Sequence, residues 1–297
     1  MVLPSTVISE FDRSLKDKNA ILRTDSILVF TCGAADGEGH RSARQTVMEY
    51  ADRRLSDFRF FKAETFFESF ENSAGKDLLS MEEHLASFSD CILIFLESPG
   101  AQTELGAFTV KDKLARIVLA VNSQEFQGQS SFISDGPLKK LEDISEFGSA
   151  VYANFSAILV SMPEIKDRLL RIERQRGESV NLKTYDSYVS MRPKNRMLFI
   201  YDIISLFSPI KYKNIIEVLK KLYGGKNNYD IEKELSLLQA IGFLSSCNGQ
   251  YIANQIDHPT FYRYKDFSFT EARSRVIRHY FKHSRDALAS LTSRVEP

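Results

Sequence analysis

The sequence predicts an α/β protein with two domains, a parallel β-sheet domain followed by a smaller domain of helices and a hairpin. In the first half, short apolar runs that do not alternate with polar residues are separated by segments with helical spacing. This pattern is typical of a parallel sheet with helices on both faces. The second half has three helical patterns and one hairpin pattern. A chain of 297 residues has room for about two domains.

Four strands and three helices are expected in the sheet domain. Apolar residues at helical spacing predict a helix from Ala43 to Leu55, and two more helices are predicted over residues 76–88 and 103–114. The strands are predicted at residues 26–31 (SILVFT), 58–61 (FRFF), 91–96 (CILIFL) and 116–121 (RIVLAV).

Such a sheet is of the flavodoxin-like or Rossmann-like kind, in which ligands bind beyond the carboxyl ends of the strands. The loops formed by residues 32–40 and 97–103 both follow predicted strands. We therefore expect these two loops to meet across one crevice.

The second domain is expected to be a small winged helix-turn-helix. Three helical patterns precede a hairpin in which Asn248 and Gly249 suit a two-residue turn. The helices are predicted over residues 197–207, 212–223 and 229–241.

A change of composition sets the domain boundary near residue 185. Residues 163–196 form a basic connector. We divide the chain into an N-terminal extension (1–25), the sheet domain with this connector (26–184), and the winged-helix domain with a C-terminal basic helix (185–297).

Charge argues against the simplest DNA-binding function. The candidate recognition helix begins with Asp230, Glu232 and Glu234, whereas groove-reading helices present cations and amides. We therefore favour a protein-interaction module for this domain. The last helix is basic, with Arg273, Arg275 and Arg278, and is either a solvated face or a surface that holds a phosphate backbone.

Bulk properties exclude several classes of protein. The formal net charge is +0, and no apolar run approaches the roughly 18 residues of a membrane span. The start of the sequence lacks the basic and apolar regions of a signal peptide, so we expect a cytoplasmic protein. Cys32, Cys91 and Cys247 are too far apart for a CxxC metal site and do not indicate disulfides. No metal site is expected.

Glu104 is the first candidate catalytic residue. The stretch ESPGAQTELGAF (97–108) follows a predicted strand, and its Ser-Pro-Gly turn leads into a helix with Glu104 in the first turn. Backbone N–H groups and the helix dipole would keep such a carboxylate ionised and rigid, as a nucleophile requires. An acid at this position that only complements the helix dipole is the structural alternative.

Three blocks of sequence resemble a known family. The segment SDCILIFLESPGAQTELGAFT, preceded by Glu82, resembles the core of nucleoside deoxyribosyltransferases. Together with LLSMEEHLASFSD and SSFISDGPLKKL, it more closely resembles the deoxyribosyltransferase-like effector proteins of bacterial retrons. These effectors also carry a winged-helix domain. The match covers most of residues 26–145.

The resemblance implies roles for individual residues. It makes Glu104 the nucleophile that attacks the anomeric carbon of a nucleoside and forms a glycosyl ester. Glu82 replaces the family's Asp and is expected to hold a ribose hydroxyl or the leaving base, which leaves sugar selectivity open. The substrate-binding set comprises Cys32, Gly33, Asp36, Arg41, Glu64, Ser98, Pro99, Gly100, Thr103 and Gly106.

Several of these residues also have an ordinary structural interpretation. Thr103 is expected to cap the helix and Gly106 to allow close approach, whereas the Ser-Pro-Gly stretch can be plain turn chemistry. Asp36, Arg41 and Glu64 can equally be solvated loop charges. Arg41 or Arg44 could reach a pyrophosphate.

The resemblance also implies a substrate and partners. NAD is the leading substrate, because nicotinamide leaves as a neutral molecule without protonation; nucleosides or nucleotides are the alternative. No cofactor is expected. The protein would be the toxic effector of a toxin-antitoxin-like antiphage system, held inactive by the retron reverse transcriptase and its msDNA, and a homo-oligomer without a membrane anchor. The rival hypothesis is a non-catalytic nucleotide sensor that binds DNA.

Overall fold

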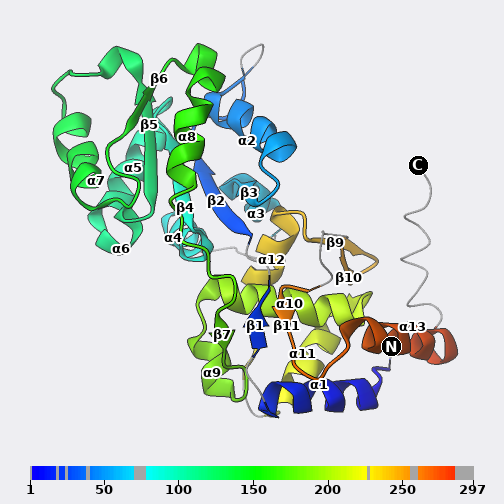
Figure 1. Ribbon diagram of the computed structural model, residues 1–297. Coiled ribbons are helices and arrows are strands. Elements are labelled where there is room, and N and C mark those ends of the chain that lie inside the picture. Colours follow the sequence, from blue (N-terminus) through cyan, green and yellow to red (C-terminus); the bar gives the residue numbers. More distant parts are fainter. Residues whose placement is uncertain are drawn as a thin grey trace. The chain divides into compact units, whose positions relative to one another are not determined.

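The chain folds into two compact units (Figure 1), residues 26–174 and residues 1–25 together with 175–297. The computed structural model describes residues 2–17, 20–23, 26–37, 41–69, 78–225, 228–254 and 260–284. The predicted division had an N-terminal extension and a boundary near residue 185. In the structure the first 25 residues belong to the C-terminal unit, because their strand pairs with strands from that half.

The N-terminal unit contains one five-stranded sheet in which every neighbouring pair of strands is parallel. Its spatial order is β3-β2-β4-β5-β6, the 2-1-3-4-5 order of flavodoxin-like folds. The order of strands reverses between β2 and β4, which is where ligands bind in such sheets. The strands are β2 (Ile27–Cys32), β3 (Phe58–Phe61), β4 (Cys91–Phe95), β5 (Val118–Ser123) and β6 (Val151–Ala153).

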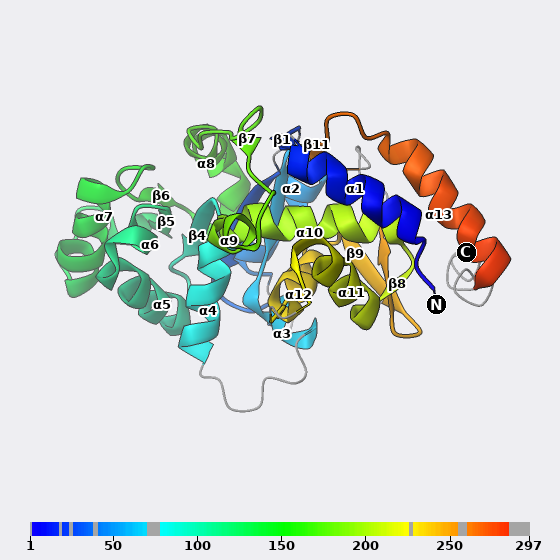
Figure 2. The same cartoon turned by 90° about the horizontal axis from the view of Figure 1, so that it is seen from below.

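Helices cover both faces of this sheet, as the continuous apolar strands predicted. On one face, Val47 of α2 and Ile165 of α8 share a buried core with Val29 and Leu93. On the other face, the Phe30 ring packs on Phe61 and on Phe108 of α5. The helices of this unit (Figures 1 and 2) are α2 (Ala43–Arg54), α3 (Ala63–Ser69), α4 (Leu78–Phe88), α5 (Pro99–Val110), α6 (Asp112–Ala115), α7 (Lys139–Ile144) and α8 (Met162–Leu169).

Two predicted helices have different bounds in the structure. The helix expected over 103–114 begins four residues earlier, because Ser98 caps it and Pro99 fits its first turn; it ends at Val110, and α6 follows. The helix expected over 76–88 is described from Leu78, and residues 76 and 77 lie outside the described part. Strand β6 was not predicted, since it has only three residues.

The C-terminal unit is built around α10 (Pro193–Phe207), in which twelve of fifteen residues are buried. The predicted segment 197–207 lies within α10, the segment 212–223 is a helix with the same bounds, and the segment 229–241 is helical from Glu232 to Ala240. Besides α10, the described part of this unit contains five helices. These helices are α1 (Ser5–Asp17), α9 (Tyr185–Ser190), α11 (Tyr212–Tyr223), α12 (Glu232–Ala240) and α13 (Phe269–His283).

Two small antiparallel sheets complete this unit. The predicted hairpin is present, and its turn residues Asn248 and Gly249 have φ of 51° and 69°, the positive values that a tight hairpin turn requires. It forms the sheet β8-β10-β9, and β1 lies between β11 and β7 in the other. The strands are β1 (Ala20–Leu22), β7 (Ser179–Val180), β8 (Ile210–Lys211), β9 (Leu244–Cys247), β10 (Gln250–Ala253) and β11 (Tyr262–Arg263).

Asp202 fixes the strand β11 to the central helix α10. Its carboxylate accepts hydrogen bonds from the Phe261 and Tyr262 amides at 2.7 and 2.9 Å and from the Tyr264 hydroxyl at 2.7 Å. Burial raises the pKa of Asp202 to about 7, against the opposing effect of these three donors. Among the helices that the structure describes, none has the length and apolar character needed to cross a bilayer.

Candidate active site

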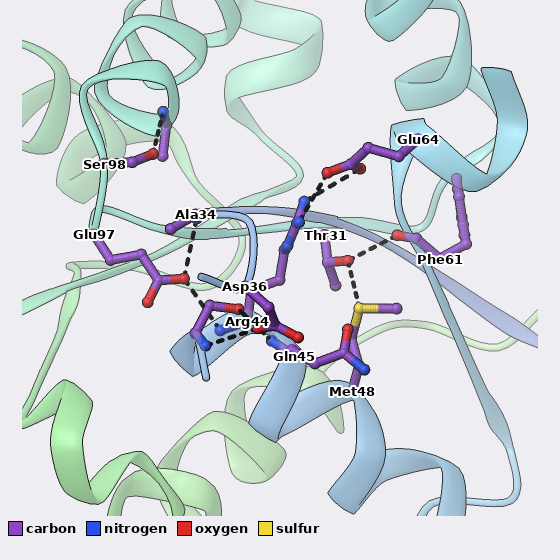
Figure 3. A network of polar contacts seen from close by, with 12 residues as sticks. Thr31, Ala34, Asp36, Arg44, Gln45, Met48, Phe61, Glu64, Glu97 and Ser98 are labelled. Atoms are coloured by element: carbon purple, nitrogen blue, oxygen red, sulfur yellow. Dashed lines mark hydrogen bonds and ion pairs between the residues drawn. The ribbon is translucent and has the colours of Figure 1, made fainter. Parts of the chain in front are cut away.

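The loops after β2 and β4 meet at the carboxyl edge of the sheet, as predicted. Glu97, two residues after β4, accepts hydrogen bonds from the amides of Ala34, Ala43 and Arg44 at 3.1, 2.8 and 3.2 Å (Figure 3). Ala43 and Arg44 open helix α2, whose free amides and dipole favour an anion. This role of Glu97 was not predicted, although its place directly after a buried strand is a signal that could have found it.

Glu104 lies in the second turn of α5, not in the first turn as predicted. The helix begins at Pro99, so that Glu104 is its sixth residue and lies beyond the free amides of the helix start. Burial raises the pKa of Glu104, whereas the Cys32 hydrogen bond and the Arg44 charge act in the opposite direction. The expectation that the helix start keeps this carboxylate ionised is therefore wrong.

The side chains of Glu82 and Glu104 form a hydrogen-bonded pair of carboxyl groups. Glu82 comes from α4, and burial and repulsion by Glu104 and Glu64 raise its pKa to about 7. Two adjacent carboxyl groups cannot both ionise freely, so each makes loss of the other's proton less favourable. The structure thus brings together the two residues that were predicted from the sequence as catalytic.

The thiol of Cys32 also hydrogen-bonds with Glu104. Cys32 ends strand β2 and is 3% exposed. Burial, together with the charges of Glu104 and Glu82, raises the thiol pKa well above its usual value. The protonated thiol is therefore a donor to Glu104 and not a nucleophile in its own right.

Arg44 supplies the positive charge beside these acids. Its side chain, from α2, is 6% exposed and makes two hydrogen bonds with Glu64, at 2.8 and 3.3 Å. Although burial opposes the change, the bond from Arg44 lowers the pKa of Glu64. We call Cys32, Arg44, Glu64, Glu82 and Glu104 the carboxyl-edge cluster. Arg44 is engaged with Glu64 in this structure, and its contact with a pyrophosphate stays a prediction.

Gly33 is needed because two side chains approach its backbone. A Cβ atom at this position would lie 2.8 Å from Glu97 Oε1 and 2.9 Å from Arg44 Cβ. Both distances are shorter than ordinary contacts between heavy atoms. Gly33 therefore allows the Arg44 side chain to lie against the end of β2, next to Cys32.

Asp36 and Arg41 make local contacts in this structure. The Asp36 carboxylate accepts hydrogen bonds from the Ser42 amide at 2.9 Å and the Ser42 hydroxyl at 3.0 Å, and the first of these is the main cause of its lowered pKa. Arg41 pairs with Glu49 at 2.8 Å on the surface. A substrate role for either residue stays a prediction.

The remaining predicted residues belong to helix α5. Ser98 caps the helix by accepting the Ala101 amide at 3.2 Å, and Pro99 and Gly100 form its first turn. Thr103 does not cap the helix; its hydroxyl donates to the Pro99 carbonyl at 2.9 Å. A Cβ atom added at Gly106 would meet no described atom within 4 Å beyond its own helix and chain neighbours, so close packing does not explain this glycine. The substrate roles of these residues stay predictions.

Within the described residues, no group of three or more His, Cys, Asp or Glu side chains could hold a metal ion. A cavity of about 710 Å³ lies in the C-terminal unit, lined by α1, the segment 264–268 and α13. Its wall is a mixture of acids and bases, and two of them, Glu10 and Arg275, already pair with each other at 2.7 Å. The carboxyl-edge cluster, with its perturbed acids, is the better candidate for chemistry.

Some charged residues that were predicted to contact partners form hydrogen bonds or ion pairs within the C-terminal unit. Arg273 donates to the carbonyls of Leu206 and Ser208 at the end of α10. Glu234 is 3% exposed and pairs with Arg196 at 2.8 Å. The Glu234 side chain is therefore buried, and the half-buried Arg273 is already engaged with backbone carbonyls. Arg285, a further basic residue of the sequence that was predicted to form the last helix, lies outside the described residues.

Comparison with known proteins identifies the family of this chain. The Escherichia coli protein named "Retron Ec73 putative ribosyltransferase/DNA-binding protein" is 31% identical over 256 residues, 80% of this chain and 81% of that protein. The corresponding retron Ec86 protein of Escherichia coli is 29% identical over 208 residues, 66% of this chain and 64% of that protein. Residues 40–246 match the family described as "STM3845 retron effector protein", and the chain belongs to this family of retron effectors.

Proposed function

We propose that the N-terminal unit is an N-glycosidase that cleaves NAD through the nucleophile Glu104. The observation that carries this proposal is the carboxyl pair at the strand-order reversal of the sheet, where Glu104 Oε2 is buried and has no hydrogen-bond partner among the described residues. The names of both relatives, which include ribosyltransferase, support chemistry at the anomeric carbon of a ribose.

In the proposed reaction, Glu104 Oε2 attacks C1′ of the sugar as the C1′–N bond breaks and its electron pair leaves with the base. The product is a glycosyl ester on Glu104, which water then hydrolyses. Cys32 donates a hydrogen bond that orients the carboxyl group. Arg44 lies close enough to lower the pKa of Glu104, which favours the ionised form needed for attack.

Glu82 would control the proton of the pair. With a pKa of about 7 it carries a proton in part of the population at neutral pH. It could give this proton to a departing base and later accept one from the attacking water. Nicotinamide needs no such proton on leaving NAD, so NAD cleavage uses Glu82 mainly in the second step.

Nucleosides or nucleotides are the second candidate substrates. Their neutral bases depart more readily when protonated, and Glu82 has a pKa suited to that role. With an acceptor other than water, the same ester would give a deoxyribosyltransferase or ribosyltransferase reaction. The two candidates differ in whether activity needs the protonated form of Glu82.

We further propose that the C-terminal unit is a winged-helix module that joins the retron reverse transcriptase and msDNA, which hold the toxic activity inactive. The order α10-β8-α11-α12-β9-β10 supports this fold, and the relatives' names include DNA binding. The acidic first turn of α12, with Glu232, argues against sequence reading by that helix. A nucleotide-sensing DNA-binding regulator without catalysis is the alternative.

The test is base release by the purified protein from NAD and from a panel of nucleosides and nucleotides. We expect nicotinamide from NAD with the wild type and none with Glu104→Gln. The matched control is Glu125→Gln, a carboxylate on an exposed turn of the same unit, which should keep wild-type activity. Release of another base alone would identify the second candidate. No release from any substrate would favour the non-catalytic regulator.

A further inference from the structure

Two polar atoms of the carboxyl-edge cluster are buried without a hydrogen-bond partner among the described residues. They are Arg44 Nε, a donor, and Glu104 Oε2, an acceptor. Buried polar groups in proteins are nearly always paired, and each exception calls for an explanation. An unpaired donor and an unpaired acceptor in the same cluster indicate a ligand that supplies both partners.

Arg44 is held in place by contacts at both ends of its side chain. The stem lies against Gly33, since a Cβ there would be 2.9 Å from Arg44 Cβ and 3.4 Å from Arg44 Cδ. The two terminal nitrogens bind Glu64, and Figure 3 shows the side chain extending from α2 toward that residue. The guanidinium group therefore cannot turn freely to satisfy Nε within the protein.

The position of Arg44 relates this unpaired donor to the nucleophile. Gly33 follows Cys32, whose thiol hydrogen-bonds with Glu104. The charge of Arg44 also acts on both Cys32 and Glu104. A group bound at Glu104 is thus bound beside Arg44.

We propose that Arg44 is a specificity-determining residue that recognises a ribose 2′-hydroxyl, so that the site prefers ribosyl substrates to their 2′-deoxyribosyl counterparts. This inference rests on the proposed attack by Glu104. A hydroxyl combines an acceptor and a donor in one small group: its oxygen accepts from Arg44 Nε, and its hydrogen is directed to the Glu104 carboxyl. The 2′-hydroxyl is on the carbon next to the attacked C1′, which brings it beside this carboxyl.

The test compares ribosyl and 2′-deoxyribosyl substrates in the wild type and in Arg44→Lys. Lysine keeps a positive charge within reach of Glu64 but has no Nε–H in the guanidinium geometry. The substrates are NAD and its analogue without the 2′-hydroxyl on the nicotinamide ribose, and adenosine and 2′-deoxyadenosine. In the wild type we expect kcat/KM to favour the ribosyl form by about tenfold or more, as for a hydrogen bond to a charged group. In Arg44→Lys this preference should fall by about tenfold.

The control is Arg53→Lys, the same change at an exposed position of the same helix, which should keep the wild-type preference. An Arg44→Lys protein that cleaves both forms more slowly but with an unchanged ratio would overturn the proposal, because a purely structural role acts on both forms alike. Arg44→Gln is the second variant should Arg44→Lys not fold, with thermal unfolding as the check.

Measurements of substrate binding test the role of Arg44 independently of the proposed catalytic function. If no substrate is cleaved, calorimetry with the wild-type protein and the same four compounds still measures the preference for the 2′-hydroxyl. Tighter binding of the ribosyl forms, lost in Arg44→Lys, would support the role of Arg44 although the catalytic proposal had failed. Equal binding of both forms by the wild type would overturn it.

Discussion

Asp202 in the C-terminal unit is fully buried and Glu104 in the N-terminal unit is half-buried, and burial raises the pKa of both, but their surroundings differ. Three donors from Phe261, Tyr262 and Tyr264 bind both oxygens of Asp202. Glu104 has one oxygen without a partner among the described residues and is hydrogen-bonded with a second acid, Glu82. A fully bonded buried carboxylate fixes one segment to another, whereas an incompletely bonded one beside a second acid is suited to chemistry.

The largest expected effect is the loss of catalysis in Glu104→Gln. Removing the attacking oxygen should lower base release by about 10³-fold or more, as in other enzymes that lose a nucleophile. The midpoint of thermal unfolding should stay equal or rise, because the change removes one of two adjacent acids. Base release and thermal unfolding of the same preparation measure both effects. Wild-type activity in the folded variant would show that Glu104 is not the nucleophile.

Asp202→Ala should lower the stability of the protein without lowering its catalytic activity, the opposite of Glu104→Gln. It leaves three buried donors without an acceptor, and we expect the free energy of unfolding to fall by about 3 kcal/mol or more. Tyrosine fluorescence in urea can follow this unfolding, since the sequence contains 12 Tyr and no Trp. Per folded molecule, base release should be unchanged. A variant as stable as the wild type would mean that the three donors find other acceptors. It would contradict the structural role given to Asp202 in the comparison with Glu104.

Glu82→Gln should weaken activity by about 10²-fold, less than the loss in Glu104→Gln, because it removes the group that gives and accepts protons and not the attacking atom. The pKa of Glu82 is about 7. Cleavage that needs its proton should therefore decline as the pH rises through 7, and this decline should be absent in the variant. NAD cleavage, which uses ionised Glu82 mainly to accept a proton from water, should show no such decline. Activity equal to wild type at every pH would remove Glu82 from the mechanism.

The raised pKa of Glu82 also predicts that the stability of the protein depends on pH. Because the folded value lies above the unfolded value of about 4.5, the protonated carboxyl stabilises the fold at low pH, and this contribution is lost as the pH rises toward 7. Urea unfolding of the wild type between pH 4.5 and pH 7 should show this loss, and Glu82→Gln should show less of it.

The elements of the fold were easier to predict from the sequence than their grouping. Apolar runs and turn residues predicted the strands Cys91–Phe95 and Phe58–Phe61 and the Asn248-Gly249 hairpin, because periodicity and turn chemistry are local properties. The membership of residues 1–25 in the C-terminal unit depends on strand pairing over more than 150 residues, for example Ile21 with Ser179. No local pattern contains that information.

For the candidate site, Glu104 was predicted from its position after a strand, Glu82 was predicted from the resemblance, and the structure brings them together. Their ionisation could not be predicted in the same way. It depends on Arg44, Cys32 and Glu64, which come from three other elements, and on a helix that starts at Pro99 rather than Thr103. Glu97 lies in the stretch that carries the motif. Its hydrogen bonds with the amides of Ala43 and Arg44 indicate a structural role, since they fix the segment after β4 to the start of α2.

The smallest expected effect concerns the basic residues of α13, where the same distinction between bonded and available charges applies. Arg273 is engaged with the carbonyls of Leu206 and Ser208, whereas Arg275 and Arg278 are exposed, the former paired with Glu10. If α13 holds the phosphates of msDNA, Arg275→Gln with Arg278→Gln should flatten the dependence of log K on log salt by about 0.7 to 0.9 of a unit for each lost contact. Arg273→Gln should lower stability and leave the slope unchanged.

Titration of labelled msDNA with wild-type and variant proteins at several salt concentrations measures the slopes. A slope that is the same in the double variant and the wild type would leave α13 as a solvated basic face, and contacts with the reverse transcriptase would then be the basis of the proposed inhibition.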